Sequence, residues 1–250
     1  MQMNDRMLML LEAISVEGSA AGPLDLARHT GLPQATTYRL LGELERLKLA
    51  ERVGQGYRIG SRLCRIVLGG IPEDHLRSAL GPELRALADE TGETSFVARL
   101  TGSGVELFLR ELPNDGVSGG VLPPVGLRPA ICSAAKAILA YLPVAEQNEM
   151  IAKMKLRFPG QPDREDDEYR REMARIAESS FATCFGEEDP DIGSFATSLP
   201  VQGRKGYFCV GIVGLRSRIE TSWLSKQPVL QAKAALMSSR MADYPSLLSA

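Results

Sequence analysis

The sequence is poor in the residues that bind metals or form disulfides. Four cysteines and two histidines occur among 250 residues. The cysteines are too widely spaced for a paired thiol motif, and no secretion signal points to an oxidising compartment. A zinc site would need distant ligands without a recognisable spacing. We therefore expect reduced, mostly buried thiols, no metal and no cofactor. The cysteines are Cys64, Cys132, Cys184 and Cys209.

Long apolar runs and catalytic motifs are also scarce. Met1 to Val16 is partly apolar, but it carries acidic residues and is too short to span a bilayer. No Gly-rich phosphate-binding loop is present. These absences predict a cytoplasmic protein that has no membrane partner and is not an enzyme, with no catalytic residue.

One four-residue pattern matches a catalytic motif. Ser133-Ala134-Ala135-Lys136 fits the Ser-x-x-Lys pattern of penicillin-recognising serine enzymes, in which the lysine assists deprotonation of the serine. The companion Ser-Asp-Asn and Lys-Thr-Gly elements are missing. A serine acyl-enzyme hydrolase is therefore the least favoured alternative.

Positive charge is concentrated near the N-terminal end. The chain has a net charge of -2, yet residues 28–65 contain eight basic and three acidic residues. A local excess of this kind is what phosphate binding requires, although a solvated basic face has the same composition. The charge therefore indicates where a nucleic acid would bind, without showing by itself that one does.

The first 31 residues predict two helices. Apolar residues with the three-four spacing of an amphipathic helix extend from Asp5, a candidate N-cap, to Val16, and Gly18 ends this helix. A shorter helix begins at Pro23. Gly31 ends it, because glycine readily adopts the positive φ of a tight turn.

A third helix is predicted from Gln34 to about Lys48. Its apolar stripe consists of Leu40, Leu41, Leu44 and Leu47. The polar side chains expected to point elsewhere are Gln34, Thr36, Thr37 and Arg39. Gln and Arg make two-point hydrogen bonds to base edges, and Thr can contact a thymine methyl or a phosphate. The helix is therefore suited to the major groove, with Tyr38 anchoring the helix or a phosphate.

Two short strands, Ala50–Val53 and Tyr57–Ile59, are predicted around the turn Gly54-Gln55-Gly56. Helix, helix, turn, helix and hairpin is the order of a winged helix-turn-helix, although a small helical dimerisation module has the same periodicity. In a winged helix, basic side chains of the hairpin reach the sugar-phosphate backbone. The candidate DNA-binding residues are Arg28, Gln34, Thr36, Thr37, Tyr38, Arg39, Lys48, Arg52 and Arg58.

Two stretches of this region resemble a known family. The first contains the turn Gly31-Leu32-Pro33 followed by Thr36-x-Tyr38-Arg39-Leu40-Leu41, and the second ends in Tyr57-Arg58-Ile59-Gly60. Both are similar to the DNA-binding half of the IclR family of transcriptional regulators. The resemblance implies a sequence-specific regulator that binds double-stranded operator DNA as a homodimer or a dimer of dimers.

The rest of the chain predicts a linker and a larger α+β domain. A helix over 61–68 is broken at 69–72, and a leucine-rich helix follows it. Beyond residue 92, segments typical of an antiparallel sheet flanked by helices alternate. The expected strands are 94–100, 105–112, 194–201 and 207–213, and the expected helices are 134–141, 166–179 and 222–241. We predict a DNA-binding domain over 1–60, a linker over 61–72 and an effector-binding or oligomerisation domain over 73–250.

The resemblance continues in this larger domain, through Thr91-Gly92-Glu93-Thr94 and the stretch Pro124-Val125-Gly126 ahead of Ala134-Ala135-Lys136-Ala137. It implies a GAF-like sensor domain that binds a small organic acid or an aromatic effector. Carried over to this chain, the ligand-binding amides are those of Ser133 and Ala134, with Cys132 just before them. A helix start favours a carboxylate through its unpaired amides and its dipole.

Departures from the family pattern leave the ligand open. Gly186 stands where the family often has an acidic residue, and Ala196, Gly211 and Val213 stand where a cysteine and two serine-like residues often line the pocket. Side chains able to compensate are Glu188, Asp189, Ser198, Cys209 and Arg99. Such a pocket binds a less polar ligand, a larger one, or none, in which case the domain only holds a dimer together. A co-regulator that recruits a partner without reading bases is a further alternative.

Overall fold

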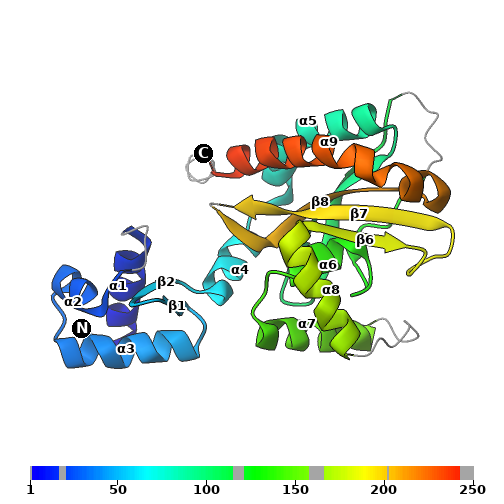
Figure 1. Ribbon diagram of the computed structural model, residues 1–250. Coiled ribbons are helices and arrows are strands. Elements are labelled where there is room, and N and C mark those ends of the chain that lie inside the picture. Colours follow the sequence, from blue (N-terminus) through cyan, green and yellow to red (C-terminus); the bar gives the residue numbers. More distant parts are fainter. Residues whose placement is uncertain (1, 17–20, 115–120, 158–165, 202, 243–250) are drawn as a thin grey trace. The chain divides into compact units, whose positions relative to one another are not determined.

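The computed structural model describes residues 2–16, 21–114, 121–157, 166–201 and 203–242 (Figure 1). The chain divides into two compact units, Met1–Gly70 and Ile71–Ala250. Each unit has a hydrophobic core of its own. Among the described residues, no helix is both long enough and apolar enough to cross a bilayer.

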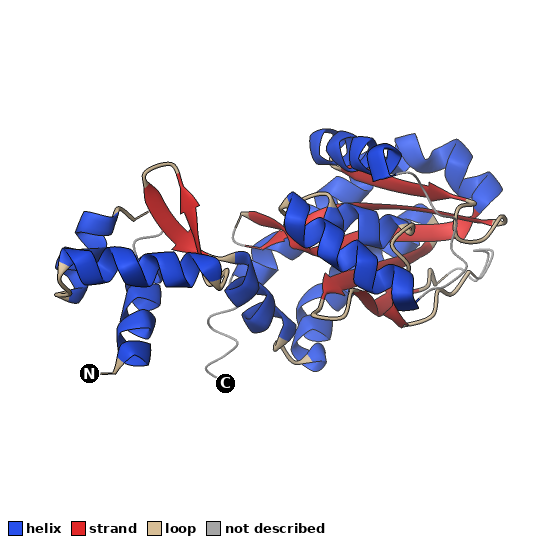
Figure 2. Cartoon of the chain, turned by 90° about the horizontal axis from the view of Figure 1, so that it is seen from below, coloured by secondary structure: helices blue, strands red, loops and turns tan. Residues whose placement is uncertain are grey.

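Three helices, a β-hairpin and a further helix make up the N-terminal unit. They are α1 (Met3–Val16), α2 (Pro23–Thr30), α3 (Gln34–Arg46), β1 (Ala50–Val53), β2 (Gly56–Ile59) and α4 (Ser61–Gly69). The two strands pair antiparallel, and the hairpin projects beside the helices (Figure 2). This is the element order of a winged helix-turn-helix, as the sequence predicts.

Leucine side chains form the core of this unit. Leu10 of α1, Leu26 of α2 and Leu40, Leu41 and Leu44 of α3 are fully buried. Their spacing of three and four residues brings them to one face of each helix. Each buried leucine stabilises the fold by roughly 1.5–3 kcal/mol relative to an exposed one. The core therefore fixes which face of α3 remains open to solvent.

Three boundaries differ from the predicted ones. Asp5 lies inside α1 rather than at its N-cap, and its carboxylate accepts a hydrogen bond from a backbone N–H three residues earlier at 2.9 Å. Helix α3 ends at Arg46, and Lys48 just beyond it is left-handed, with φ 58°. Strand β2 begins at Gly56, which leaves a two-residue hairpin loop. The predicted helix end at Gly18 lies outside the described residues.

A six-stranded antiparallel sheet organises the C-terminal unit, with strand order β5-β4-β3-β8-β7-β6. Its elements are α5 (Glu73–Thr91), β3 (Thr94–Leu100), β4 (Val105–Glu111), β5 (Gly126–Leu127), α6 (Ser133–Leu139), α7 (Val144–Arg157), α8 (Asp166–Ser179), β6 (Phe181–Phe185), β7 (Ile192–Val201), β8 (Arg204–Leu215) and α9 (Arg216–Ala242). The predicted α+β class is confirmed. The sequence reasoning missed α7, β5 and β6.

Helices cover both faces of this sheet. Helices α5 and α9 lie side by side on one face, and α6, α7 and α8 lie on the other (Figure 1). Because both faces are covered, strands β3 and β8 are buried along nearly their whole length. Helix α6 packs directly on β7 and β8, which places its first residues against the middle of the sheet.

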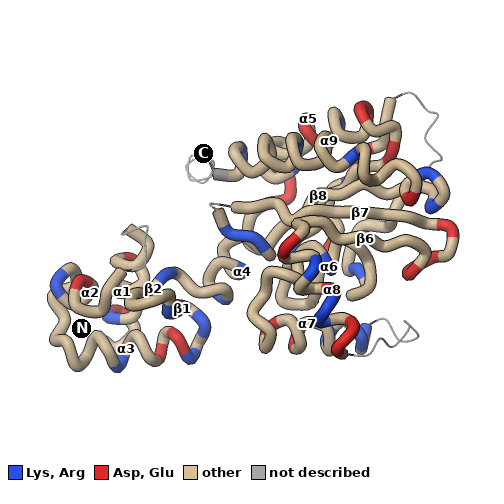
Figure 3. The backbone as a smooth tube through the Cα atoms, viewed as in Figure 1, with Lys and Arg blue, Asp and Glu red and all other residues tan. Residues whose placement is uncertain are grey.

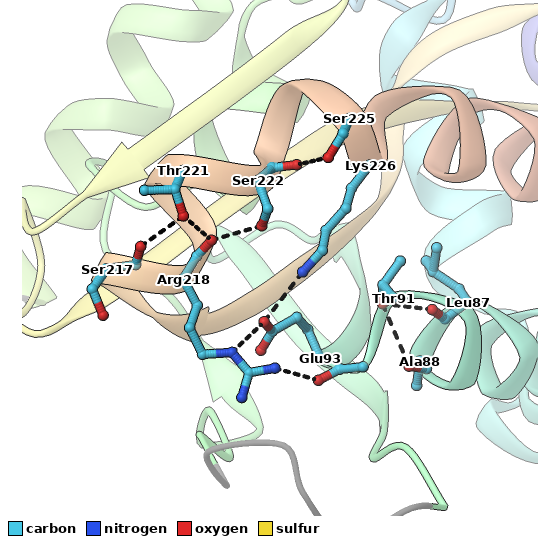
Figure 4. A network of polar contacts seen from close by, with 11 residues as sticks. Leu87, Ala88, Thr91, Glu93, Ser217, Arg218, Thr221, Ser222, Ser225 and Lys226 are labelled. Atoms are coloured by element: carbon cyan, nitrogen blue, oxygen red, sulfur yellow. Dashed lines mark hydrogen bonds and ion pairs between the residues drawn. The ribbon is translucent and has the colours of Figure 1, made fainter.

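A buried carboxylate connects α9 to the turn after α5 (Figure 4). Glu93, at the turn between α5 and β3, is 1% exposed. Its Oε1 lies 3.0 Å from Nε of Arg218 and 3.2 Å from Nζ of Lys226, both on α9. Gly214 of β8 leaves room for this carboxylate, since a Cβ at that position would overlap it. The two cations together compensate the buried charge of Glu93.

Candidate DNA-binding surface and ligand cavity

Helix α3 exposes a polar face near its N-terminal end. Gln34, Tyr38 and Arg39 are exposed, and Thr36 is half-buried. The first turns of a recognition helix are the part that meets base edges in the major groove. Gln and Arg there can each make two-point contacts with a base. Four of the five side chains predicted on α3 are therefore accessible to DNA.

Thr37 corrects the prediction for this helix. Its side chain is 0% exposed, and its Oγ1 donates a hydrogen bond to the backbone carbonyl of Pro33 at 3.2 Å. Thr37 precedes Leu40, Leu41 and Leu44 by three, four and seven residues, so it shares their buried face. It is a packing residue of the core and does not point toward DNA.

Basic residues occur along the hairpin and in α2 (Figure 3). Arg52 is exposed. Arg58 pairs with Glu51 across the hairpin, and Arg28 lies 3.3 Å from Asp25 in α2. Solvent-exposed pairs of this kind contribute at most about 1 kcal/mol. A phosphate can therefore compete for these arginines without a large loss of stability.

Gly60, directly after the hairpin, lies close to the backbone that follows α3. A Cβ at this position would collide with the backbone of Lys48 and Leu49. The close approach lets the Gly60 N–H donate to the carbonyl of Leu49 at 2.8 Å, and the Arg62 N–H donate to that of Lys48 at 3.1 Å. The contact fixes the hairpin against the end of α3.

A cavity of about 250 Å³ lies in the C-terminal unit, between the sheet and the start of α6. Apolar side chains, among them Phe96, Leu107 and Val213, form much of its wall. Six of the residues predicted to contact an effector line it. They are Cys132, Ser133, Ala134, Glu188, Asp189 and Val213.

Ser198 and Arg99 do not line this cavity, and neither do four other predicted residues. Ala196 and Gly211 face each other in the β7–β8 register, where a Cβ on Gly211 would meet the Phe96 ring. Cys209 is fully buried, and its Sγ donates to the carbonyl of Ala134 at 3.5 Å. Gly186 has φ 78° and lies under the side chain of Arg216. All four are packing or turn positions.

Two polar contacts on the cavity wall were missed by the sequence reasoning. Arg128, 9% exposed, donates Nη2 to Oε1 of Glu188 and Nη1 to the carbonyl of Pro124 at 3.4 Å. The hydroxyls of Ser133 and Ser194 lie 2.7 Å apart. Arg128 could have been identified from the sequence, because it is a charged residue in an apolar stretch just before α6. Ser194 could not, since only the fold brings β7 to this helix.

Two thiols on the cavity wall are held in the neutral form. Burial raises the pKa of Cys132 to about 12, and the negative charge of Glu188 adds to this shift. Burial likewise raises the pKa of Cys184. The Cys132 Sγ accepts a hydrogen bond from the Ala135 backbone N–H at 3.4 Å, which caps α6. These cysteines act as apolar wall groups rather than nucleophiles.

Lys136 has a structural role instead of a catalytic one. Its side chain is 0% exposed, and Nζ donates to Glu172 at 2.9 Å, to Glu187 at 2.6 Å and to the carbonyl of Thr183 at 3.0 Å. The hydroxyl of Ser133 pairs with Ser194, so the Ser-x-x-Lys pattern does not form a nucleophile and base. These contacts therefore contradict the alternative of a serine acyl-enzyme hydrolase.

Known proteins are similar to this chain in sequence and in architecture. A family model for the IclR helix-turn-helix domain matches residues 5–54. The HTH-type transcriptional regulator TtgV of Pseudomonas putida is 29% identical over 217 residues, which cover 83% of this chain and 80% of TtgV. These matches support an IclR-family transcriptional regulator, in agreement with the predicted resemblance. The relatives that the chain matches are transcriptional regulators and not enzymes.

Solved IclR structures have the same fold as this chain. A proposed IclR transcriptional regulator from Silicibacter aligns with TM-score 0.60 and 23% identity, over 97% of this chain and 96% of that one. An IclR homologue from Microbacterium hydrocarbonoxydans, solved with 4-hydroxybenzoate, aligns with TM-score 0.58 and 20% identity, over 96% of this chain and 99% of that one. At these identities the likeness establishes the fold.

Proposed function

We propose that this IclR-family regulator binds an operator through α3 and the β1–β2 hairpin, and that a small organic ligand in the cavity controls its binding. Gln34 and Arg39, with Thr36 and Tyr38, contact the DNA from α3. Basic residues around them, Arg28, Lys48, Arg52 and Arg58, contact phosphates. The observation that carries this assignment is the exposed polar face on α3, opposite its buried leucines.

The proposed division of labour follows the two units. Residues 1–60 bind DNA, residues 61–72 connect, and residues 73–250 bind the effector and hold a homodimer or a dimer of dimers together. A dimer places two α3 helices on two half-sites of an operator. Sedimentation equilibrium of the purified chain measures the oligomer directly, and a monomer at micromolar concentration would contradict this part.

Arg39→Ala tests the DNA-binding face. We expect a loss of about 1–3 kcal/mol in operator affinity and relaxed base preference, because a two-point base contact is removed. Arg58→Ala should weaken binding to all sequences alike, since a phosphate contact carries no base information. Arg170→Ala is the control, because that exposed arginine of α8 pairs with Asp167 in the other unit. Fluorescence anisotropy across a salt series measures all three.

A ligand screen tests the sensing function. Trp223, the single tryptophan of the chain, packs on Phe185 and Phe195 in the C-terminal unit, so its fluorescence reports unfolding there. A bound ligand raises the midpoint of that transition by mass action. Val213→Phe should fill the cavity and abolish the shift. If no organic acid or aromatic compound shifts the unmodified protein, the domain only holds the dimer, which is the second candidate function.

A further inference from the structure

The ionisable groups on the cavity wall are unevenly balanced. Among the described residues, the charged side chains that line the cavity are Arg128, Glu188 and Asp189. Arg128 is the cation of this set, and its guanidinium already donates to Glu188. Asp189 adds a second negative charge. The wall therefore carries one positive and two negative charges before any ligand binds.

A carboxylate ligand gains little from these three charged side chains. To pair with Arg128 it must share the guanidinium with Glu188, which already accepts a hydrogen bond from one of its N–H groups. The ligand then loses its own hydration and lies beside Glu188 and Asp189, and neighbouring like charges disfavour the ionised form. A guanidinium carries a single positive charge, so Arg128 cannot balance both Glu188 and the carboxylate of a ligand.

An uncharged ligand meets better-matched partners. Ser133 and Ser194 form a hydroxyl pair, in which one hydroxyl donates to the other. The hydroxyl that accepts retains its own hydrogen, which can be donated to a hydroxyl or carbonyl oxygen of a ligand. The wall around this pair is largely apolar, including Phe96 and Ile192. Both features favour a neutral molecule with one polar group.

We infer that the Arg128–Glu188 ion pair makes the cavity selective for uncharged aromatic or alicyclic ligands that carry a hydroxyl or carbonyl group, and that it rejects the corresponding carboxylates. This inference rests on the proposed ligand-sensing function and specifies the class of ligand. Glu188 is the specificity-determining residue, because it neutralises the cation that would otherwise attract a carboxylate. Arg128 without its partner would be an anion site.

Matched pairs of probes test the charge preference. Each pair is a carboxylate and its amide, such as 4-hydroxybenzoate and 4-hydroxybenzamide, which have nearly the same size and differ by one charge. Binding to the full chain is measured by calorimetry and by the Trp223 unfolding midpoint. We expect the amide of each binding pair to be favoured by about tenfold or more.

The variant Glu188→Gln should reverse this preference, because it frees the charge of Arg128 while keeping a side chain of similar shape. Glu220→Gln is the matched control. That glutamate pairs with Arg216 at 3.0 Å on the exposed surface of α9, so the same chemical change there should leave the preference unchanged.

The outcomes separate the two levels of the proposal. Tighter binding of carboxylates to the unmodified protein overturns the charge selectivity and leaves ligand sensing intact. An unchanged preference in Glu188→Gln overturns the role of Glu188. If no probe of either class binds the unmodified protein or Glu188→Gln, ligand sensing through this cavity fails, and the selectivity fails with it.

Discussion

Removing the charge of Lys136 should destabilise the C-terminal unit strongly. In Lys136→Met the apolar stem is kept, but Glu172, Glu187 and the carbonyl of Thr183 lose a shared donor at 2.6–3.0 Å. Because Lys136 is completely buried, the two carboxylates lose a compensating charge in a site that water does not reach at Nζ. Breaking a buried pair in this way costs about 3–5 kcal/mol. For a unit of this size the loss corresponds to roughly 6–20 °C in the unfolding midpoint.

Trp223 fluorescence during urea and thermal unfolding measures this loss in the unit that contains Lys136. Lys153→Met is the control, because Lys153 pairs with Glu149 at 2.8 Å with both side chains about half exposed, and should cost less than about 0.5 kcal/mol. Adding Glu187→Gln to Lys136→Met should recover part of the loss. Equal, small effects of the two lysine variants would refute the reasoning, since burial would then not determine the cost.

Three further predictions follow from packing and burial. Gly211→Ala should lower the unfolding free energy of the C-terminal unit by about 1–3 kcal/mol, measured by urea denaturation, because its Cβ would overlap the Phe96 ring and the Phe195 carbonyl. Thr37→Val should cost about 0.5–1.5 kcal/mol in stability, measured by circular dichroism, and leave base preference unchanged, because only the hydrogen bond to Pro33 is lost. The raised pKa of Cys132 stabilises the fold below its ordinary pKa of 9, and this contribution should fade as pH rises toward about 12. The stability difference between the unmodified protein and Cys132→Ala should therefore shrink over that interval, and a constant difference would contradict the assignment.

The N-terminal unit was predictable because its signals are local. Leucines spaced by three and four residues, a proline at the start of α2 and of α3, and glycines at the turns are all short-range features. Thr37 shows the limit of treating side chains by type. It was assigned to the polar face because threonine is polar, although its spacing to Leu40, Leu41 and Leu44 already placed it on the buried one.

The elements that the sequence reasoning missed show no clear periodicity of apolar residues. Helix α7 buries Glu146, Gln147, Met150 and Met154, so two of its four buried residues are polar and no apolar stripe marks it. Strand β6 has five residues and lies at the edge of the sheet. Such short or polar segments become ordered through tertiary contacts, which a local pattern does not contain.

The cavity depends on register and on long-range convergence. Arg128 and Glu188 are separated by 60 positions, and Ser133 and Ser194 by 61. Family resemblance located the start of α6 correctly. Ala196 and Gly211 are in register with Phe96 and lie two positions from Ser194 and Val213, so they share the sheet face that lines the cavity, but the Phe96 ring lies against Gly211. The packing of a side chain from another strand therefore decides which residues of that face reach the ligand space.

Substitutions of Glu187 and of Glu188 should affect different properties, the first the stability of the unit and the second its ligand preference. The two residues are neighbours in the turn after β6, yet Glu187 pairs with the buried Lys136 and Glu188 with Arg128 at the cavity. Glu187→Gln should therefore lower the Trp223 unfolding midpoint and leave the carboxylate-to-amide preference unchanged. Glu188→Gln should change that preference with a smaller effect on the midpoint, since the Arg128 side chain is 11% exposed and keeps its bond to the Pro124 carbonyl, whereas Lys136 is completely buried. Parallel changes of both readouts in both variants would mean that the turn acts as one unit, because displacement of either carboxylate would then rearrange both ion pairs.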